Sequence, residues 1–276
     1  MAPVTGRTEL RVVCAQLDGH NASRQARTEA ATAAVARAAS GSQEATLVVL
    51  PELWPVGFFH FDDYAALAEP LHGPTLNALA DAARTAQVWV YGGSFVERDD
   101  RGRLFNTGCL VDDHGALRLT YRKLHLFGLD SSERALLTPG LEAPVAATPW
   151  GIVGAATCYD LRFPELFREL ALGGATLLVV ASAWPMVRLE QWRILLRARA
   201  VENQAFVIAC NAAGDDAGRM LAGHSAVISP LGEVIAEAGT GETTLEARID
   251  PQAATRARNG FPFLDDRRYT VTLDRA

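Results

Sequence analysis

Three residues of different chemistry stand where predicted β-strands end. Glu52, Lys123 and Cys158 each follow within two residues of a strand-like run. The carboxyl ends of strands are where open α/β folds place their sites, so we expect these side chains to meet. A thiol can attack an amide carbonyl, a carboxylate can carry its proton, and an ammonium can hold the developing oxyanion, helped by the backbone N–H of Tyr159. Together they would hydrolyse a carbon–nitrogen bond.

Cys158 differs in its setting from the other cysteines. Cys14, Cys109 and Cys210 lie inside apolar strand-like runs, where a free cysteine acts as a small core residue. Cys158 lies on a predicted strand-to-helix turn, shortly before the helix that Pro164 begins. Backbone N–H groups and the helix dipole favour a thiolate there, as at a nucleophile elbow. From this setting alone, Cys158 is either a nucleophile or a structural thiol.

An alternative interpretation of Glu52 and Lys123 is that they are solvent-exposed charges without a catalytic role. For Glu52 the apolar neighbours Leu53, Trp54 and Phe58 make a solvated loop less convincing, and apolar surroundings suit a proton shuttle. Lys123 is the only lysine among 26 basic residues. Lysine is a compact point charge that the wide guanidinium fork of arginine does not replace. Two explanations for the single lysine are possible. It is present by chance, or position 123 specifically requires an ammonium group.

The elements that must position these residues alternate between short apolar runs and longer helical segments. Strands are predicted at residues 10–17, 45–50, 88–95, 104–111, 117–121, 152–157, 176–182, 206–211, 224–229, 233–236 and 244–249. Helices are predicted at 22–39, 74–86, 164–172 and 189–204, a polar loop at 122–140 and a solvated turn at 215–216. No linker or repeat divides the chain, which predicts one α/β domain over residues 1–276, with two mixed sheets flanked by helices. Residues 259–276 are expected to form a tail that packs on a neighbouring element or a partner subunit.

Composition excludes several classes of function. The 276 residues are 49% hydrophobic and 21% charged, as in ordinary folded proteins. A net charge of −6 argues against binding to nucleic acid, and the longest apolar run, 177–184, is far shorter than the ~20 residues of a membrane span. Four cysteines without a CxxC pair, and no signal-peptide pattern, predict a cytoplasmic protein. Because no zinc, P-loop or GxGxxG motif is present, we expect no metal or nucleotide cofactor.

Six segments in a fixed order are spread along most of the chain. They are RVVCAQLD, LVVLPELW, YRKLHLF, ATCYDLRFPELFREL, RARAVENQAFVIACN and GHSAVISPLGEVIAE. Through them the chain resembles the carbon–nitrogen hydrolases of the nitrilase superfamily. The resemblance implies that Glu52, Lys123 and Cys158 form the catalytic triad and that Glu133 is a second glutamate of the site. It also implies an αββα sandwich, no cofactor or metal, and a homodimer or higher homo-oligomer.

Within the superfamily, CYDLRFPELFR and ASAWPMVRLEQWRILLRARAVENQ most resemble the ω-amidase and Nit-type branch. This implies hydrolysis of the terminal amide of a short ω-amido acid, such as 2-oxoglutaramate, through a cysteine thioester that releases ammonia. Tyr159 and Trp184 are expected to line the pocket. Arg162 is expected either to bind a substrate carboxylate or to form a salt bridge, for example with Glu165. The segment HLFGLDSSERALLTPG departs from the ω-amidase pattern, which leaves the substrate open.

Four other functions were weighed against these residues. An N-carbamoyl amino acid amidohydrolase or a nitrilase would use the same triad. A cysteine–histidine hydrolase would take one of the six histidines as its base; His125 lies two residues from Lys123, and His224 lies in the GHS segment. A non-enzymatic binding protein would have no need for three such polar residues at strand ends.

Overall fold

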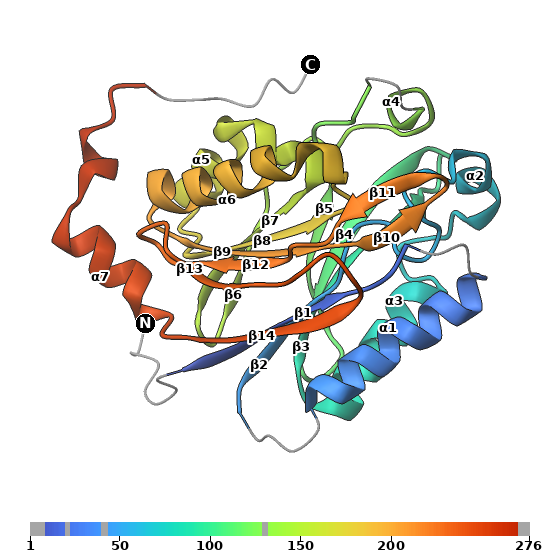
Figure 1. Cartoon of the computed structure of the whole chain (residues 1–276), viewed down its shortest axis with the longest axis horizontal. Helices are drawn as coiled ribbons and strands as arrows, with labels where there is room; N and C mark the ends of the chain where they lie inside the picture. Colours follow the sequence, from blue (N-terminus) through green and yellow to red (C-terminus); the bar gives the residue numbers. More distant parts are fainter. Residues whose placement is uncertain (1–8, 20–22, 40–43, 129–131, 270–276) are drawn as a thin grey trace.

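The computed structural model describes residues 9–19, 23–39, 44–128 and 132–269. In it, two six-stranded sheets lie face to face (Figure 1). The first sheet has the order β14 (Thr243–Ile249), β1 (Leu10–Gln16), β2 (Thr46–Val49), β3 (Trp89–Arg98), β4 (Leu104–Val111) and β5 (Leu117–Arg122). The second has the order β13 (Val234–Glu237), β12 (Ala226–Ile228), β9 (Phe206–Asn211), β8 (Leu177–Ser182), β7 (Gly151–Thr157) and β6 (Val145–Thr148).

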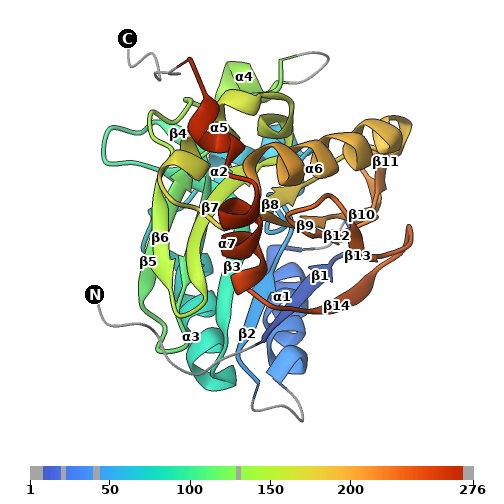
Figure 2. The same ribbon diagram turned by 90° about the vertical axis from the view of Figure 1, so that its left-hand side faces the viewer.

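Helices cover both outer faces of this pair of sheets. Helices α1 (Arg24–Ala39) and α3 (Pro74–Ala86) pack on the first sheet, and α5 (Pro164–Leu172) and α6 (Leu189–Asn203) pack on the second (Figures 1 and 2). The shorter helices are α2 (Tyr64–Leu67), α4 (Glu133–Leu136) and α7 (Gln252–Gly260). The predicted sandwich of two mixed sheets flanked by helices is therefore confirmed.

The central strands are buried on both faces, which explains their nearly continuous apolar sequences. In each sheet three central strands run parallel, β1–β2–β3 and β7–β8–β9, and antiparallel strands flank them. Along β1, Val12 and Cys14 belong to the core that lies between the sheets, whereas Val13 and Ala15 pack toward α1 and α3. This alternation with a period of two residues is what a strand requires.

Some elements were not predicted from the sequence. Strand β6 is a short edge strand in an alanine-rich segment, and α7 carries arginine at two of its nine positions. Neither has the apolar periodicity that indicates an element. Helix α7 is held instead by long-range contacts, since Gln204 Nε2 donates to the carbonyl of Ala257 at 3.0 Å and Arg258 donates to that of Ala175 at 2.6 Å.

The predicted solvated turn at 215–216 is wrong for Asp216. That residue ends β10 (Ala213–Asp216), which pairs with β11 (Arg219–Ala222) in a separate hairpin. Its carboxylate is buried, accepts the N–H of Phe59 at 3.1 Å and lies 3.1 Å from Nε2 of His60. Asp216 therefore fastens the hairpin to the segment that follows Glu52, because a buried carboxylate needs donors around it.

Candidate active site

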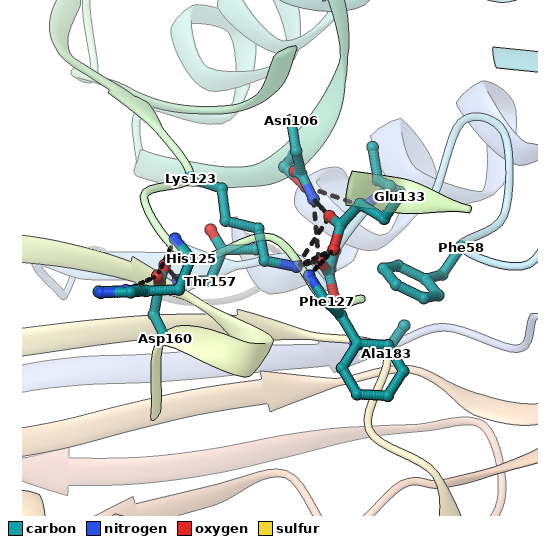
Figure 3. Close-up of polar contacts among 12 residues, drawn as sticks. Phe58, Asn106, Lys123, His125, Phe127, Glu133, Thr157, Asp160 and Ala183 are labelled. Carbon is teal, nitrogen blue, oxygen red and sulfur yellow. Dashed lines mark hydrogen bonds and ion pairs between the residues drawn. The ribbon is translucent and has the colours of Figure 1, made fainter. Parts of the chain in front are cut away.

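Lys123 lies at the centre of a buried charged cluster, formed with Glu52, Glu133 and Asn106. Its Nζ is 2.8 Å from Oε1 of Glu52 and 2.9 and 3.0 Å from the carboxylate oxygens of Glu133. Asn106, on β4, donates Nδ2 to Glu52 at 2.9 Å and to Glu133 at 3.1 Å (Figure 3). The two carboxylates and the ammonium are fully shielded from solvent. Three of the four residues predicted for the centre of the site are thus in contact.

Backbone amides hold both carboxylates in place. Oε2 of Glu52 accepts the N–H of Ala183 at 3.0 Å, and Oε2 of Glu133 accepts the N–H of Phe127 at 2.7 Å. Glu52 follows a strand of the first sheet, whereas Ala183 follows β8 of the second. The charged cluster therefore lies where the carboxyl ends of strands from both sheets meet, as the sequence predicts.

Cys158 lies beside this cluster at the end of β7. It is the first residue of the short 3₁₀ helix η2 (Cys158–Arg162), and its φ of +47° is in the left-handed region. Leu53, next to Glu52, has a φ of +45°, and its N–H donates to Oγ of Ser94 at 3.0 Å. Such a conformation costs a non-glycine residue roughly 1–2 kcal/mol and persists only where the surroundings impose it. Both strand ends that carry reactive groups are thus sharply turned.

Asp160 stabilises the turn at Cys158. This fully buried carboxylate accepts the N–H of Thr157 at 2.9 Å and the hydroxyl of Tyr121 at 2.6 Å. It also accepts the N–H of His125 at 3.0 Å and lies 2.8 Å from Nδ1 of that residue (Figure 3). One carboxylate therefore connects the end of β7 with β5 and with the segment after Lys123.

Two glycines allow the chain to approach closely where Glu52 and Lys123 are held. A Cβ at Gly93, whose φ is +64°, would overlap with the carbonyl oxygen of Pro51. A Cβ at Gly140 would overlap with the carbonyl oxygen of Arg122, and the N–H of Gly140 donates to the carbonyl of Lys123 at 2.9 Å. Glycine is required at such points because any side chain would displace the backbone.

Burial sets the protonation of the site. It raises the pKa of the Cys158 thiol well above its ordinary value, and the Glu52 carboxylate adds to the rise, against the opposing effect of Lys123. Burial by itself lowers the pKa of Lys123, but the carboxylates of Glu133 and Glu52 outweigh it and raise that pKa. Burial also raises the pKa of Glu133, while Lys123 opposes the rise. Near neutral pH the site therefore holds an ammonium and a neutral thiol, in contrast to the thiolate that the turn was predicted to favour, and attack by Cys158 needs a proton acceptor.

A cavity of about 430 Å³ opens above Cys158. Its floor, the buried part, consists of Phe58, Cys158, Ala183 and Trp184. Its rim, the outer part, lies on η3 (Met186–Arg188), on the turn between β10 and β11 and on the start of β11, and consists of Val187, Arg188, Gly218, Arg219 and Met220. Phe59, Phe127, Tyr159, Arg162, Pro185 and Met186 complete the lining. The thiol is thus the reactive group that a molecule in this cavity would meet.

The three residues predicted to bind substrate all line the cavity. Tyr159 and Trp184 contribute their rings, and the guanidinium of Arg162 stands 4.9 Å from the Trp184 ring centre. Arg162 donates to Oε1 of Gln191 at 2.7 Å, so the predicted alternative, a salt bridge with Glu165, is not formed. Arg162 therefore lies in the cavity wall, and its binding of a substrate carboxylate stays a prediction.

Comparison with known proteins identifies the family. The carbon–nitrogen hydrolase family matches residues 11–259. The chain belongs to this carbon–nitrogen hydrolase family. It is 38% identical over 239 residues to a 2-oxoglutaramate amidase of Paenarthrobacter nicotinovorans, a match that covers 84% of this chain and 81% of that protein.

Two solved structures of carbon–nitrogen hydrolases extend the comparison. Nit3 of Saccharomyces cerevisiae, from branch 10 of the nitrilase superfamily, is 30% identical with a TM-score of 0.88, over 97% of this chain and 99% of that one. A variant of an amidase from Nesterenkonia sp. AN1 is 25% identical with a TM-score of 0.78, over 97% and 96% of the chains. It carries the acetamide moiety of fluoroacetamide on its active-site cysteine. The predicted superfamily and Nit-type branch are confirmed.

Family membership and geometry decide between the functions left open by the sequence. A carbon–nitrogen hydrolase is an enzyme, which excludes a purely binding role, and its amidase relatives favour amide hydrolysis over nitrile or carbamoyl hydrolysis. No histidine in the described ranges lines the cavity, and His20 lies outside them. His125 stacks on Phe163 with ring centres 3.7 Å apart and does not line the cavity that contains Cys158, which disfavours it as the base.

Some residues of this hydrolase site were missed from the sequence. Buried Asn106 donates hydrogen bonds to the two carboxylates, and buried Asp160 accepts the N–H of Thr157 at the turn before Cys158. Arg188 and Arg219, which line the cavity, were also missed. An asparagine inside the apolar strand LFNTGCLV was the available signal for Asn106, because buried amides need partners. Within the described residues no group of three or more potential ligands could hold a metal ion, and no helix is long and apolar enough to cross a membrane.

Proposed function

We propose that this hydrolase cleaves the terminal amide of a small ω-amido acid through a thioester on Cys158. The observation that carries the proposal is the contact between Lys123 and Glu52, sealed from solvent beside a thiol that faces the cavity. The identity with a 2-oxoglutaramate amidase supports an acyl group of this type. Arg162 in the cavity wall is proposed to bind the substrate carboxylate.

In the acylation step, Glu52 takes the thiol proton as Sγ of Cys158 bonds to the amide carbon. The carbonyl oxygen becomes an oxyanion, which the ammonium of Lys123 and the N–H of Tyr159 stabilise. When the carbon–nitrogen bond breaks, Glu52 returns the proton to the leaving nitrogen, and ammonia departs. Glu133 and Asn106 hold Lys123 and Glu52 at their contact distances throughout.

In the deacylation step, water replaces ammonia and the same groups act again. Glu52 takes a proton from the water molecule, and the oxygen of that water molecule bonds to the thioester carbon. The carbon–sulfur bond then breaks, the sulfur regains a proton from Glu52, and the carboxylic acid leaves. The sum is one amide and one water converted to one acid and one ammonia, with the enzyme restored.

The first experiment is ammonia release from 2-oxoglutaramate, succinamate, glutamine, N-carbamoyl amino acids and short nitriles. We expect turnover of the ω-amido acids by the wild type and a fall in kcat of about 10⁴-fold or more in Cys158→Ala, because the described residues that line the cavity include no second cysteine and no serine or threonine. A Cys158→Ala enzyme with full activity would refute the thioester. Turnover of only nitriles or carbamoyl compounds would refute the substrate class and keep the triad.

We further propose that residues 1–276 fold as one domain and that the protein is a cytoplasmic homodimer. The tail at 259–276 is proposed to pack on the partner subunit. Exposed aromatic residues support the role of the tail, since Phe261 is 69% and Tyr269 is 91% exposed; residues 270–276 lie outside the described part of the chain. Four unpaired cysteines support a reducing compartment. Light scattering of the full chain and of a chain ending at Asn259 tests the assembly. We expect a dimer that the truncation weakens. The same number of subunits in both proteins would refute the role of the tail.

A further inference from the structure

Two aromatic rings hold the guanidinium of Arg162 in the wall of the cavity. Arg162 is the last residue of η2, which begins with Cys158, and it is one of the residues that line the cavity. Its guanidinium stands 4.9 Å from the ring centre of Trp184 and 6.0 Å from that of Tyr159. Because an aromatic face attracts a cation, the two rings restrict where this guanidinium can lie.

The hydrogen-bond partner of Arg162 is a neutral amide on α6. Nη2 of Arg162 donates to Oε1 of Gln191 at 2.7 Å, and Gln191 lies near the start of that helix. Gln191 is exposed and is not among the residues that line the cavity. The oxygen of a glutamine accepts a hydrogen bond from a guanidinium, as a carboxylate does, but it adds no negative charge. Arg162 is thus held in place by a partner that leaves its charge intact.

The acidic residues near Arg162 do not neutralise it. Within the described parts of the chain Arg162 forms no ion pair with a carboxylate, and its polar contact is the one with Gln191. Glu190, the neighbour of Gln191 on α6, pairs instead with Arg193 at 2.9 Å. The described residues that line the cavity include no aspartate or glutamate. A molecule in the cavity therefore meets Arg162 as an uncompensated cation, which favours an anionic group there.

We propose that Gln191 is a positioning residue that fixes Arg162 without neutralising it, and that it thereby sets the preference of the enzyme for amides that carry a carboxylate. The inference rests on the proposed function, in which Arg162 binds the substrate carboxylate. A guanidinium that is already in place loses less conformational freedom when a ligand binds, which strengthens binding. Its intact charge distinguishes an anionic end group from a neutral one. The substitution Gln191→Glu keeps the first effect and removes the second.

The main test compares succinamate with succinamide in the wild type and in Gln191→Glu. The two compounds share one carbon chain, and succinamide has a neutral amide in place of the carboxylate. We expect the ratio of their kcat/KM values, succinamate over succinamide, to fall by about 10- to 100-fold in the variant, because the new carboxylate pairs with Arg162 and repels that of the substrate. The change should lie in KM for succinamate, with kcat altered by less than about twofold, since Gln191 does not touch the reacting groups. If succinamide is too slow to measure, KM for succinamate decides alone. An unchanged ratio or KM would overturn the proposal.

A second variant separates the position of Arg162 from its charge. Gln191→Leu removes the acceptor of the hydrogen bond but adds no charge, so KM for succinamate is expected to rise by only about three- to tenfold. A rise as large as that in Gln191→Glu would refute the role of charge.

The matched control is Gln252→Glu, which makes the same change of charge at an exposed position of α7. No residue of this helix lines the cavity, so both kinetic constants should stay as in the wild type. An equal fall of the ratio in this control would mean that the net charge of the protein, and not the partner of Arg162, sets the preference.

These outcomes are separable from a failure of the proposed function. If no ω-amido acid releases ammonia in a Cys158-dependent manner, the proposed function fails, and the role of Gln191 fails with it. If succinamate is hydrolysed through Cys158 with the same KM and the same ratio in Gln191→Glu, the thioester mechanism stands and only the role of Gln191 is refuted. Because Gln191 is exposed, its variants should fold as the wild type does, which thermal unfolding verifies.

Discussion

The buried charged cluster beside Cys158 and the exposed rim of the cavity are built on different principles. Each carboxylate of the charged cluster accepts hydrogen bonds from Lys123, from Asn106 and from a backbone amide. At the rim, Val187 and Met220 are largely exposed, and the arginines rest on aromatic rings. A buried ion loses much by the removal of one partner, whereas an exposed side chain loses little. The cluster therefore fixes the reaction, and the rim is free to vary with the substrate.

The largest effect is expected when the cluster loses its cation. Lys123→Met leaves two buried carboxylates without their shared ammonium, which should lower the free energy of unfolding by about 3–5 kcal/mol and kcat by about 10³-fold. Urea denaturation and steady-state kinetics measure the two losses, with the exposed Arg84→Met as the matched control. A Lys123→Met enzyme as stable and active as the control would contradict the claim that the charged cluster depends on each of its partners.

A smaller effect is expected at the carboxylate that holds the turn at Cys158. Asp160→Asn keeps the shape but replaces one acceptor oxygen by a donor facing the N–H of Thr157 or the hydroxyl of Tyr121. We expect kcat to fall about 10- to 100-fold with KM little changed, and the free energy of unfolding to fall by about 1–3 kcal/mol. If KM rises while kcat is kept, Asp160 acts on substrate binding instead of on the position of Cys158.

The pH dependence of activity distinguishes a shared proton from a free thiolate. Because burial and Glu52 raise the pKa of Cys158, the thiol keeps its proton above pH 9. We therefore expect kcat/KM to stay level between pH 7 and 9. An enzyme that needed an unassisted thiolate with the ordinary pKa of about 8.5 would gain nearly tenfold per pH unit over the lower part of this range. Such a rise would contradict proton transfer to Glu52.

The same shift has a consequence for stability. In the unfolded chain the thiol ionises near pH 8.5, while the folded protein retains the proton. Above this pH the unfolded chain therefore binds fewer protons than the folded protein. The free energy of unfolding should then fall above about pH 8.5, by up to ~1.4 kcal/mol per pH unit for this thiol. Cys158→Ala should lessen that slope, which denaturation at several pH values measures. An unchanged slope would show that the thiol is not buried as a neutral group.

The smallest effect is expected at the rim. Val187→Ser replaces a side chain that is 87% exposed, so the free energy of unfolding should change by less than about 0.5 kcal/mol. Because Val187 lines the cavity, KM for the amide that the wild type hydrolyses is expected to change by no more than a few-fold, with kcat unchanged. A loss of stability comparable to that of Lys123→Met would mean that cluster and rim are not built differently.

The limits of the sequence are visible in particular residues. The strands before Glu52 and Cys158 were predicted because burial on both faces imposes continuous apolar runs. The strand before Lys123 was predicted from alternating apolar and polar residues, as in a half-exposed edge strand. Asp216 was mistaken for a solvated residue because its partners, Phe59 and His60, are more than 150 positions away in the chain. A local pattern carries no information about such a partner.

The sequence by itself determined most of the strands, the types of the reactive groups and the turn at Cys158, because these depend on side-chain chemistry and local periodicity. Only the tertiary structure decided that Glu52, Lys123 and Glu133 touch, that Asn106 holds two carboxylates, and that two arginines stand at the cavity mouth. Contacts of this kind arise when strand ends of two sheets and the loops between them meet. Their energy comes from desolvation, which depends on the whole fold.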